Sequence, residues 1–301
     1  MSTFLPARLD RIGVPPIKCQ GIKTRLAAFI AQSLVWEGRG RWIEPFLGSG
    51  SVLFNIAPRK AIAADSNIHI IRFYRDLQSG ALNETIVRDY LEEAGRMLRD
   101  TEGSYYYRVR EEFNRVGGGS LEFLFLSRAC FNGVLRFNGR GEYNVPFNHK
   151  PARFSRAYIT KIVNQVAWVR GLLLDRDWSL AASGWEDTLS AARAEDFVYL
   201  DPPYIGRHAD YFSKWSEEDA LRLARTAETL PCGFALSMWK ENQYRSNEHL
   251  RDHWKGLVTR TFRHYYHVGP KESLRHEMTE ALLIKPGYAP TEACPPVNRI
   301  R

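Results

Sequence analysis

Short apolar runs recur along most of the chain, and each is followed by turn residues and then by a stretch of helical periodicity. The runs are Trp42–Ile43, Ala61–Ala64, Phe197–Leu200, Phe234–Trp239 and Ala281–Ile284. They are continuous rather than alternating, as expected for strands that are buried on both faces of a parallel sheet. The pattern therefore predicts an α/β fold.

Two helices can be placed between these strands. The first is indicated by apolar residues at helical spacing, which are Leu26, Phe29, Ile30 and Leu34. The second begins at Ser216, because Asp219 three residues later completes a capping box. Both helices are expected to pack on a face of the sheet.

The pattern changes between residues 72 and 170. The stretch YYYRVREEFNRV has helical character, Gly117–Gly119 interrupts it, and FNGRGEYN carries Gly139 and Gly141 as the turn of a β-hairpin. We expect a catalytic domain made of residues 1–71 and 171–287. The mainly helical segment 72–170 would be inserted into it, and residues 288–301 would form a C-terminal tail.

Positive charge is concentrated in the second half of this inserted segment. The chain has 42 Lys and Arg against 34 Asp and Glu. Between residues 128 and 161 the only acid is Glu142, and the basic residues are Arg128, Arg136, Arg140, Lys150, Arg153, Arg156 and Lys161. Aromatic residues lie among them, namely Phe131, Phe137, Tyr143, Phe147, Phe154 and Tyr158. This mixture can neutralise phosphates and stack bases, which favours nucleic acid over the alternative of a solvated basic loop with core aromatics.

No apolar run approaches the roughly 20 residues that cross a bilayer, and the start MSTFLPARLDR lacks the apolar stretch of a secretory signal. We therefore expect a cytoplasmic protein with no membrane partner. The four cysteines lie far apart, without the Cys or His spacing of a zinc site. Neither a disulfide nor a metal is expected.

A glycine turn follows the first predicted strand. In RWIEPFLGSGSVLFN, Gly48 and Gly50 allow a tight bend and the close approach of a nucleotide-like ligand. Leu53 occupies the position of the third glycine of a dinucleotide fingerprint, which disfavours an oxidoreductase. Asp65 ends the next strand, where a carboxylate can accept hydrogen bonds from ribose hydroxyls. A helix N-cap is the alternative for Asp65.

The tetrapeptide DPPY, residues 201–204, follows the strand at Phe197–Leu200. An exocyclic amine of adenine or cytosine becomes nucleophilic when two acceptors draw its hydrogens, and Asp201 and the carbonyl of Pro202 can act as that pair. Pro202 and Pro203 make the loop rigid, and Tyr204 offers a ring on which a base can stack. The base would have to be flipped out of its duplex to reach them.

The order of IKCQGIK, EPFLGSGSV, Asp65, FNGVLRFNGRGEYNVPF and DPPY resembles the Dam-type, D12-class DNA adenine-N6 methyltransferases. Within that family PPIKCQGIKT, FLFLSRACFNG, AYITKIVNQV, DPPYIGRH and HYYHVG are most similar to the branch of the EcoRV modification enzymes. The resemblance implies a Rossmann-like S-adenosylmethionine-dependent methyltransferase sheet with an inserted target-recognition domain. Its substrate would be double-stranded DNA, bound by a monomer.

The resemblance also assigns roles to the cofactor-binding residues. Lys23 would meet the carboxylate of S-adenosylmethionine, and Asp65 would hold the ribose hydroxyls. Phe46, Gly48 and Gly50 would line the methionine and ribose, Trp185 would lie near the cofactor adenine, and Asp201 would lie between cofactor and target amine. Cys19 belongs to the same set, but many members carry tryptophan at its position, so a stacking role is not transferred.

A second set would contact DNA. Phe131 and Asn132 would fill the space left by the flipped base, Val134 would wedge beside a base step, and Arg136 would read a guanine edge, for which an arginine is suited. Asn138 and Arg140 belong to the same hairpin, and Arg153 is a candidate phosphate contact. The resemblance favours GATATC as the recognition site, in a type II restriction-modification or phage setting.

Other functions remain open at this level. A DNA cytosine-N4 methyltransferase more often has serine where this chain has Asp201. RNA and protein-glutamine methyltransferases usually have less than the gap of about 150 residues that separates Gly50 from Asp201. A non-catalytic DNA-binding module would keep the basic segment, but Asp201 argues against it.

Overall fold

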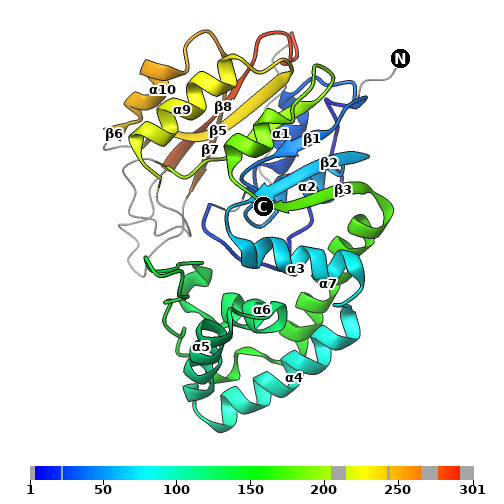
Figure 1. Cartoon of the computed structure of the whole chain (residues 1–301), viewed down its shortest axis with the longest axis vertical. Coiled ribbons are helices and arrows are strands. Elements are labelled where there is room, and N and C mark those ends of the chain that lie inside the picture. The colour runs from blue at the N-terminus through cyan, green and yellow to red at the C-terminus, as the bar shows by residue number, and fades with distance from the viewer. Residues whose placement is uncertain (1–3, 22, 205–214, 243–244, 266–276, 292–301) are drawn as a thin grey trace.

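The computed structural model describes residues 4–21, 23–204, 215–242, 245–265 and 277–291. Figure 1 shows two parts along the long axis of the molecule, a sheet with its covering helices and a group of helices beyond one end of it. No helix among the described residues is long and apolar enough to cross a membrane.

The sheet has the strand order β3-β2-β1-β4-β5-β8-β7, and the short β6 pairs with β5. The strands are β1 Trp42–Glu44, β2 Lys60–Asp65, β3 Asp177–Ala182, β4 Phe197–Leu200, β5 Gly233–Asn242, β6 Arg245–Ser246, β7 Val258–Tyr265 and β8 Glu277–Ile284. The first five in spatial order are parallel, whereas β8 is antiparallel to both β5 and β7.

All five predicted apolar runs lie in strands, but the prediction that the last one is parallel is wrong. β8 runs between β5 and β7 in the opposite direction, with Ala235 opposite Ile284. β3 and β7 were not predicted, because both are edge strands. In β3 the buried Trp178 and Leu180 alternate with less buried residues, so no continuous apolar run marks the strand.

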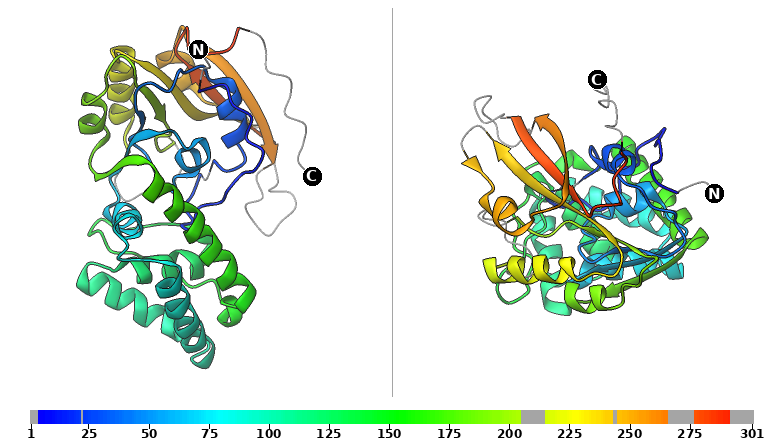
Figure 2. Two further views of the ribbon diagram at one scale, coloured as in Figure 1. Left: turned by 90° about the vertical axis from the view of Figure 1, so that its right-hand side faces the viewer. Right: turned by 90° about the horizontal axis from the view of Figure 1, so that it is seen from above.

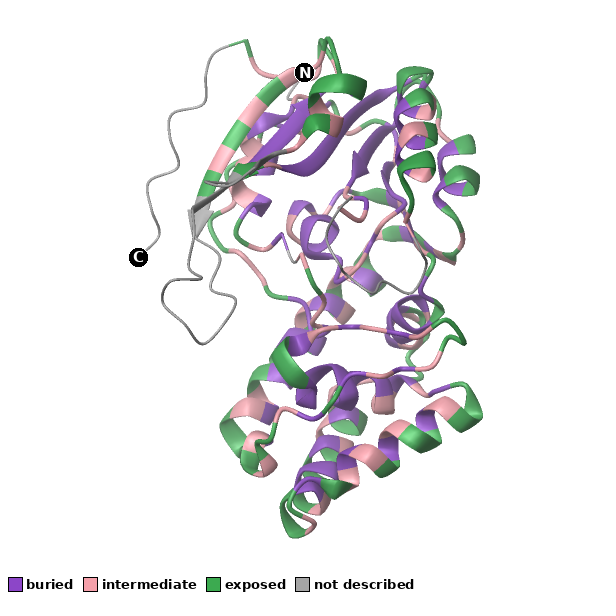
Figure 3. Ribbon diagram, turned by 90° about the vertical axis from the view of Figure 1, so that its left-hand side faces the viewer, coloured by how far each residue is buried: buried purple, intermediate pink, exposed green. Residues whose placement is uncertain are grey.

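Helices cover both faces of the sheet, as Figure 2 shows from above. One face carries α1 Ala27–Ser33, α2 Ser51–Ile56, α3 Ile68–Ser79 and the upper part of α7 Arg156–Asp175; the other carries α8 Trp185–Ser190, α9 Glu217–Glu228 and α10 Glu248–His253. Along β4, Phe197 and Tyr199 pack into the first layer, and Val198 and Leu200 pack into the second. This alternate burial explains the continuous apolar run. The central strands are accordingly buried throughout (Figure 3).

Both predicted helices are confirmed. α1 falls within the span marked by Leu26 and Leu34, and α9 begins with the reciprocal capping box of Ser216 and Asp219. The predicted break after α5 coincides with Gly117 and Gly118, both of which have positive φ.

The inserted segment is mainly helical, with α4 Glu84–Asp100, α5 Ser104–Val116 and α6 Ser120–Ala129, followed by the short 3₁₀ turns η1 Phe131–Gly133 and η2 Pro151–Arg153. Between the two turns the chain forms a hairpin with a bridge between Phe137 and Tyr143. The predicted α/β fold with a helical, hairpin-containing insert is confirmed. The proposed domain boundaries at 71/72 and 170/171 fall inside the continuous helices α3 and α7.

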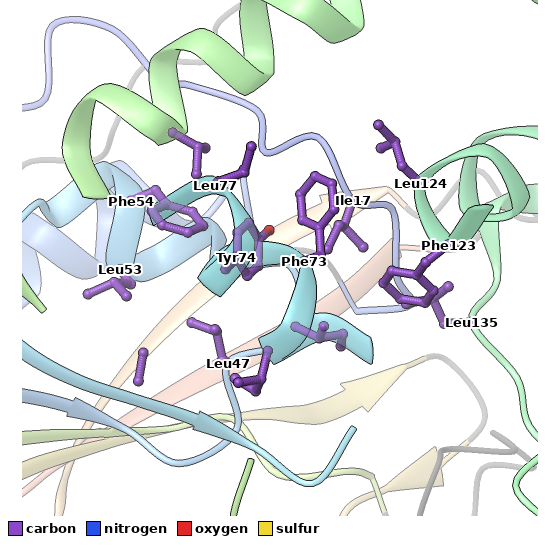
Figure 4. Close-up of a cluster of buried hydrophobic side chains, with 14 of the residues drawn as sticks. Ile17, Leu47, Leu53, Phe54, Phe73, Tyr74, Leu77, Phe123, Leu124 and Leu135 are labelled. Carbon is purple, nitrogen blue, oxygen red and sulfur yellow. The ribbon is translucent and has the colours of Figure 1, made fainter. Parts of the chain in front are cut away.

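One apolar core joins the two parts. Figure 4 shows Phe73, Tyr74 and Leu77 of α3 between Leu53 and Phe54 of α2 and residues of the insert, which are Phe123, Leu124 and Leu135. The Tyr74 hydroxyl also donates a hydrogen bond of 2.6 Å to the carbonyl of Ser49, in the glycine turn. The turn and the insert both pack on α3. Because a close-packed core yields little, their positions relative to each other are fixed.

Candidate active site

A cavity of about 340 Å³ opens at the carboxyl ends of β1, β2 and β4. The chain continues from β1 to β2 and β3 on one side and resumes with β4 and β5 on the other, and ligands of open α/β sheets bind at such a switch point. The predicted cofactor residues that line the cavity are Cys19, Lys23, Phe46, Gly48, Asp65, Trp185 and Asp201, joined by Pro202, Pro203 and Tyr204. Gly50 is the one predicted cofactor residue that does not line it.

Asp65 holds the glycine turn in place. One oxygen of its carboxylate accepts a hydrogen bond from the backbone N–H of Gly48 at 2.8 Å, and the other accepts from the N–H of Asn67 at 2.8 Å. The N-cap of α3 is Asn67, whose side chain accepts from the N–H of His69, so the alternative of Asp65 as the cap does not apply. Burial raises the pKa of Asp65, and the two backbone donors oppose the rise.

The two positions of the turn require glycine for different reasons. Gly50 has a φ of +72°, and a Cβ there would lie 2.3 Å from the ring of Phe54, so local packing requires glycine. At Gly48, with a φ of +52°, a Cβ would meet only Cys19 Sγ, at 3.6 Å. Gly48 thus keeps its side of the cavity open, whereas Gly50 shapes the backbone behind it.

Lys23 is the buried cation of the site. Its ammonium lies 2.8 Å from Oδ1 of Asp201 and donates to the Tyr204 hydroxyl at 3.0 Å and to the Gly21 carbonyl at 3.1 Å. The lysine is only 4% exposed. Burial opposes its charge, but the neighbouring carboxylates and phenols outweigh burial and hold the pKa of Lys23 well above its usual range. The structure therefore places this lysine against the DPPY carboxylate.

Two carboxyl groups of the cavity have different protonation states. Burial raises the pKa of Asp201 to about 6, Lys23 opposes the rise, and Glu280 adds to it. Burial raises the pKa of Glu44 to about 8, although Trp42 Nε1–H donates to Glu44 Oε1 at 2.9 Å. At neutral pH Asp201 is mainly ionised and Glu44 mainly protonated. Such a division separates an acceptor from a donor within one site.

Sequence reasoning missed Glu44, Tyr199, Trp215 and Glu280. Glu44 ends β1, and Tyr199 lies two residues before Asp201. Because alternate residues of a strand point to the same side, both could have been predicted from the strand pattern. The Tyr199 hydroxyl is buried at the cavity wall and makes no hydrogen bond with any described residue. Trp215 and Glu280 stand far from the motifs in sequence, and no local signal marks them.

Aromatic rings form one wall of the cavity. Phe46 and Trp215 meet edge to face with ring centres 5.6 Å apart, and Trp185 and Trp215 meet similarly at 6.4 Å. Asp65 also lines the cavity. An apolar slot and a carboxylate acceptor together suit a nucleoside-like ligand.

The predicted DNA-contact residues lie together in the hairpin region but differ in exposure. Phe131 is 52% exposed, and Asn132 is exposed with a φ of +55°. Val134 is half-buried, and Arg136 donates from Nε to Oδ1 of Asn144 at 2.8 Å. The guanidinium of Arg136 is thus held in a fixed direction.

Asn138, Arg140 and Arg153 make contacts within the fold. The Asn138 side chain accepts from the backbone N–H groups of Arg140 and Glu142, which closes the hairpin turn, and the exposed Arg140 pairs with Glu142 at 2.8 Å. Arg153 donates to the carbonyl of Arg128 at 2.5 Å and to the Tyr158 hydroxyl at 3.1 Å. DNA contact by these residues stays a prediction.

Most aromatics of the basic segment belong to the core. Phe137, Tyr143, Phe147 and Phe154 are each less than 5% exposed, which leaves no ring face for a base. Among the six aromatics counted in the sequence, Phe131 is the one that is largely exposed. The interpretation of the whole set as base-stacking residues is wrong. The number of aromatic residues in a segment does not tell which of them are buried in the core and which are exposed.

The sheet is of the Rossmann-like class, and the cavity at its switch point, beside the DPPY loop, suits a nucleoside-like ligand. The model of the D12 class N6 adenine-specific DNA methyltransferases matches residues 20–271, and the chain belongs to that family.

Three relatives illustrate the range of similarity. A DNA adenine methylase of Serratia marcescens is 33% identical over 54% of this chain and 57% of its own length. The type II methyltransferase M.MjaIII of Methanocaldococcus jannaschii is 28% identical over 70% of this chain and 78% of its own length. A DNA adenine methylase of Salmonella typhi is 30% identical over 62% and 66%. The match thus spans little more than half of the Serratia protein.

Replacing Lys23 by methionine should destabilise the fold in a pH-dependent way. Without the lysine the pKa of Asp201 rises further above its unfolded value of about 3.9, so the folded state binds protons more tightly and gains stability as pH falls. We expect a loss of about 3 kcal/mol near pH 8 that shrinks towards pH 5, measured by urea unfolding. Lys240→Met, at a half-exposed lysine of β5, is the control. An equal loss at both pH values would contradict the pairing.

Proposed function

We propose that this protein is a site-specific DNA adenine-N6 methyltransferase that transfers a methyl group from S-adenosylmethionine to a flipped adenine in duplex DNA. The observation that carries the proposal is the ionised Asp201, which lines the cavity and is held 2.8 Å from the buried Lys23. It is followed by two prolines and the ring of Tyr204, and family membership agrees with this chemistry.

The residues of the cavity fit the cofactor. The carboxylate of Asp65 suits the ribose hydroxyls, Trp185 and Phe46 suit the adenine and the apolar chain, and the unpaired Tyr199 hydroxyl offers a further polar contact. Lys23 and Cys19 approach from the N-terminal segment, and Gly48 and Gly50 form the turn beneath. When bound, S-adenosylmethionine supplies an electrophilic methyl group on its sulfonium sulfur.

The chain's own residues activate the target amine. An oxygen of Asp201 and the carbonyl of Pro202 accept the two amine hydrogens, which localises the nitrogen lone pair. Lys23 orients the carboxylate, and it leaves the second oxygen of Asp201 to the substrate because the ion pair uses Oδ1. Pro203 restricts the loop, and Tyr204 stacks on the extruded base, a contact worth about 1 to 3 kcal/mol.

The hairpin region would deliver the base from double-stranded DNA. Phe131 and Asn132 protrude from η1, where they can fill the gap left by the flipped adenine, and Val134 follows them. Arg136, aimed by Asn144, would read a guanine, with Asn138 and Arg140 at the hairpin turn and Arg153 behind it. We propose that the protein acts on DNA as a monomer, in the cytoplasm.

For the recognition sequence we propose GATATC. The support is the similarity to the EcoRV modification enzymes, and part of it, in DPPYIGRH and HYYHVG, lies outside the described residues. A type II methyltransferase stands among the relatives, which is compatible with a modification or phage setting.

Replacing Asp201 by alanine should abolish methylation while duplex binding stays within about threefold, because the carboxylate acts on the amine and not on the DNA backbone. The measurement is transfer of tritiated methyl groups from S-adenosylmethionine to defined duplexes, followed by nucleoside analysis. The control is Asp252→Ala, an exposed acid of α10 that pairs with Arg251. Retained turnover would reject the mechanism, and label in cytosine or in RNA would reject the proposed substrate.

The ratio kcat/KM for DNA should rise from acid to neutral pH with a midpoint near 6, because this ratio reports ionisations of the free enzyme. Protonated Asp201 cannot accept from the amine, and its pKa is raised to about 6. The titratable groups that interact with it are Lys23, Glu280, Glu44, Cys19, Tyr199 and Tyr204. A flat profile over this range, with DNA binding unchanged, would show that the ionisation of Asp201 does not control the rate.

Replacing Arg136 by alanine should reduce discrimination at one guanine of the site by about 10- to 100-fold, because a bidentate arginine contact is lost. The measurement compares methylation of the proposed site with duplexes that carry single base changes. The control is Arg115→Ala, an exposed arginine of α5 paired with Glu112. An unchanged mismatch profile would assign Arg136 a structural role.

A further inference from the structure

Glu280 is a second buried carboxylate beside the DPPY loop, and the proposed mechanism gives it no task. It is 4% exposed and comes from β8, near the other end of the chain from Lys23. The Tyr204 hydroxyl donates to its Oε2 at 3.5 Å, and the Lys23 ammonium lies 3.9 Å from the same oxygen.

The sheet directs this side chain towards the loop. On β8, Ala281 and Leu283 pack with the layer of α9, whereas Leu282 and Ile284 pack with the layer of α1, so alternation puts Glu280 on the α1 side. Opposite Glu280 the register of β5 shifts between Trp239 and Glu241. A bulge of this kind bends its strand and re-aims side chains next to it, and such bulges are common beside active sites.

Compensation of Lys23 does not explain the carboxylate. Asp201 already pairs with the lysine at 2.8 Å, and Glu280 is closer to the phenol of Tyr204 than to the ammonium. A second carboxylate also raises the pKa of Asp201, which works against the ionised form that accepts the amine. Its position therefore indicates a role besides this compensation, and the phenol of Tyr204 lies within hydrogen-bond distance.

Tyr204 is accordingly held at its hydroxyl from two sides. Lys23 donates to the phenol oxygen at 3.0 Å and also lies 5.1 Å from the ring centre, while the phenol donates to Glu280. A ring tethered at the hydroxyl by a strand and by the N-terminal segment keeps one orientation, whereas a ring on a two-proline loop alone would turn about its side-chain torsions.

We propose that Glu280 is a positioning residue that fixes the ring of Tyr204 in the orientation required to stack on the target base. The inference rests on the proposed function, because it assigns Glu280 a task in that reaction. Glu280 acts through the Tyr204 hydroxyl and is not among the described residues that line the cavity.

The test uses the full-length protein and two duplexes. One is methylated by the wild type in the tritium assay and gives kcat and KM; the other is the same duplex with 2-aminopurine, which lacks the 6-amino group, in place of the target adenine, and gives the fluorescence. Glu280→Ala removes the acceptor, Glu280→Gln keeps an oxygen of similar position, and Tyr204→Phe removes the hydroxyl but keeps the ring. Glu241→Gln, an exposed acid on the neighbouring strand β5, is the matched control. The readouts are bound-state fluorescence, kcat and KM for DNA, and S-adenosylmethionine affinity.

Glu280→Ala should lower kcat by about 100-fold, as expected when a group is misplaced by about 1 Å, with KM and cofactor affinity nearly unchanged. Bound 2-aminopurine should be brighter than with the wild type, because a loosely stacked base is less quenched. Glu280→Gln should restore kcat and fluorescence to within about threefold of the wild type. In the Tyr204→Phe background, Glu280→Ala should cause no further loss of kcat, since the effects of two residues that act through one contact are not additive.

Three results would overturn the inference. They are wild-type fluorescence and kcat in Glu280→Ala, an equal defect in Glu280→Gln, and an additive effect in the Tyr204→Phe background. If Glu280→Ala loses its fold, Tyr204→Phe decides instead: it should show the same brighter fluorescence and lower kcat, and wild-type values there would overturn the inference. A wild type that methylates no adenine duplex would reject the proposed function instead.

Discussion

The site depends on one buried ion pair, between Lys23 and Asp201. Burying either charge alone would cost several kcal/mol, and the pair offsets that cost because its atoms lie 2.8 Å apart and the lysine has further acceptors. The pair joins the N-terminal segment to the end of β4. Lys23 also opposes the rise that burial causes in the pKa of Asp201, so the same contact supports both the fold and the proposed chemistry.

The second constraint is the continuity of the core between sheet and insert. Tyr74 of α3 anchors the glycine turn, and His69, at the start of the same helix, stacks on Phe137 of the hairpin with ring centres 5.3 Å apart. Asp65 holds the turn from the other side. The glycine turn and the hairpin are consequently both attached to α3, so the hairpin has a fixed position relative to the cavity.

Much of the fold could be predicted from local patterns. Central strands are buried on both faces and therefore appear as continuous runs, and the capping box at Ser216 is formed by residues three apart. The edge strands β3 and β7 escaped prediction because one face of each is solvated. The direction of β8 depends on which neighbour it pairs with, and a run such as Ala281–Ile284 has the same composition in either direction.

The sequence by itself determined the α/β fold class and the order of the motifs, because Gly48 and Asp201 follow a strand, Asp65 ends one, and each can be recognised from its neighbours in the chain. Only the tertiary structure decided which of these residues line the cavity and which of them support the backbone around it. It showed that Gly50 is required by the packing of Phe54, whereas Gly48 lines the cavity. It also showed that most of the aromatic residues of the basic segment are buried in the core. It also brought Lys23, Asp201 and Glu280 together from distant parts of the chain. Ionisation and orientation depend on burial and on such neighbours, which no local pattern contains.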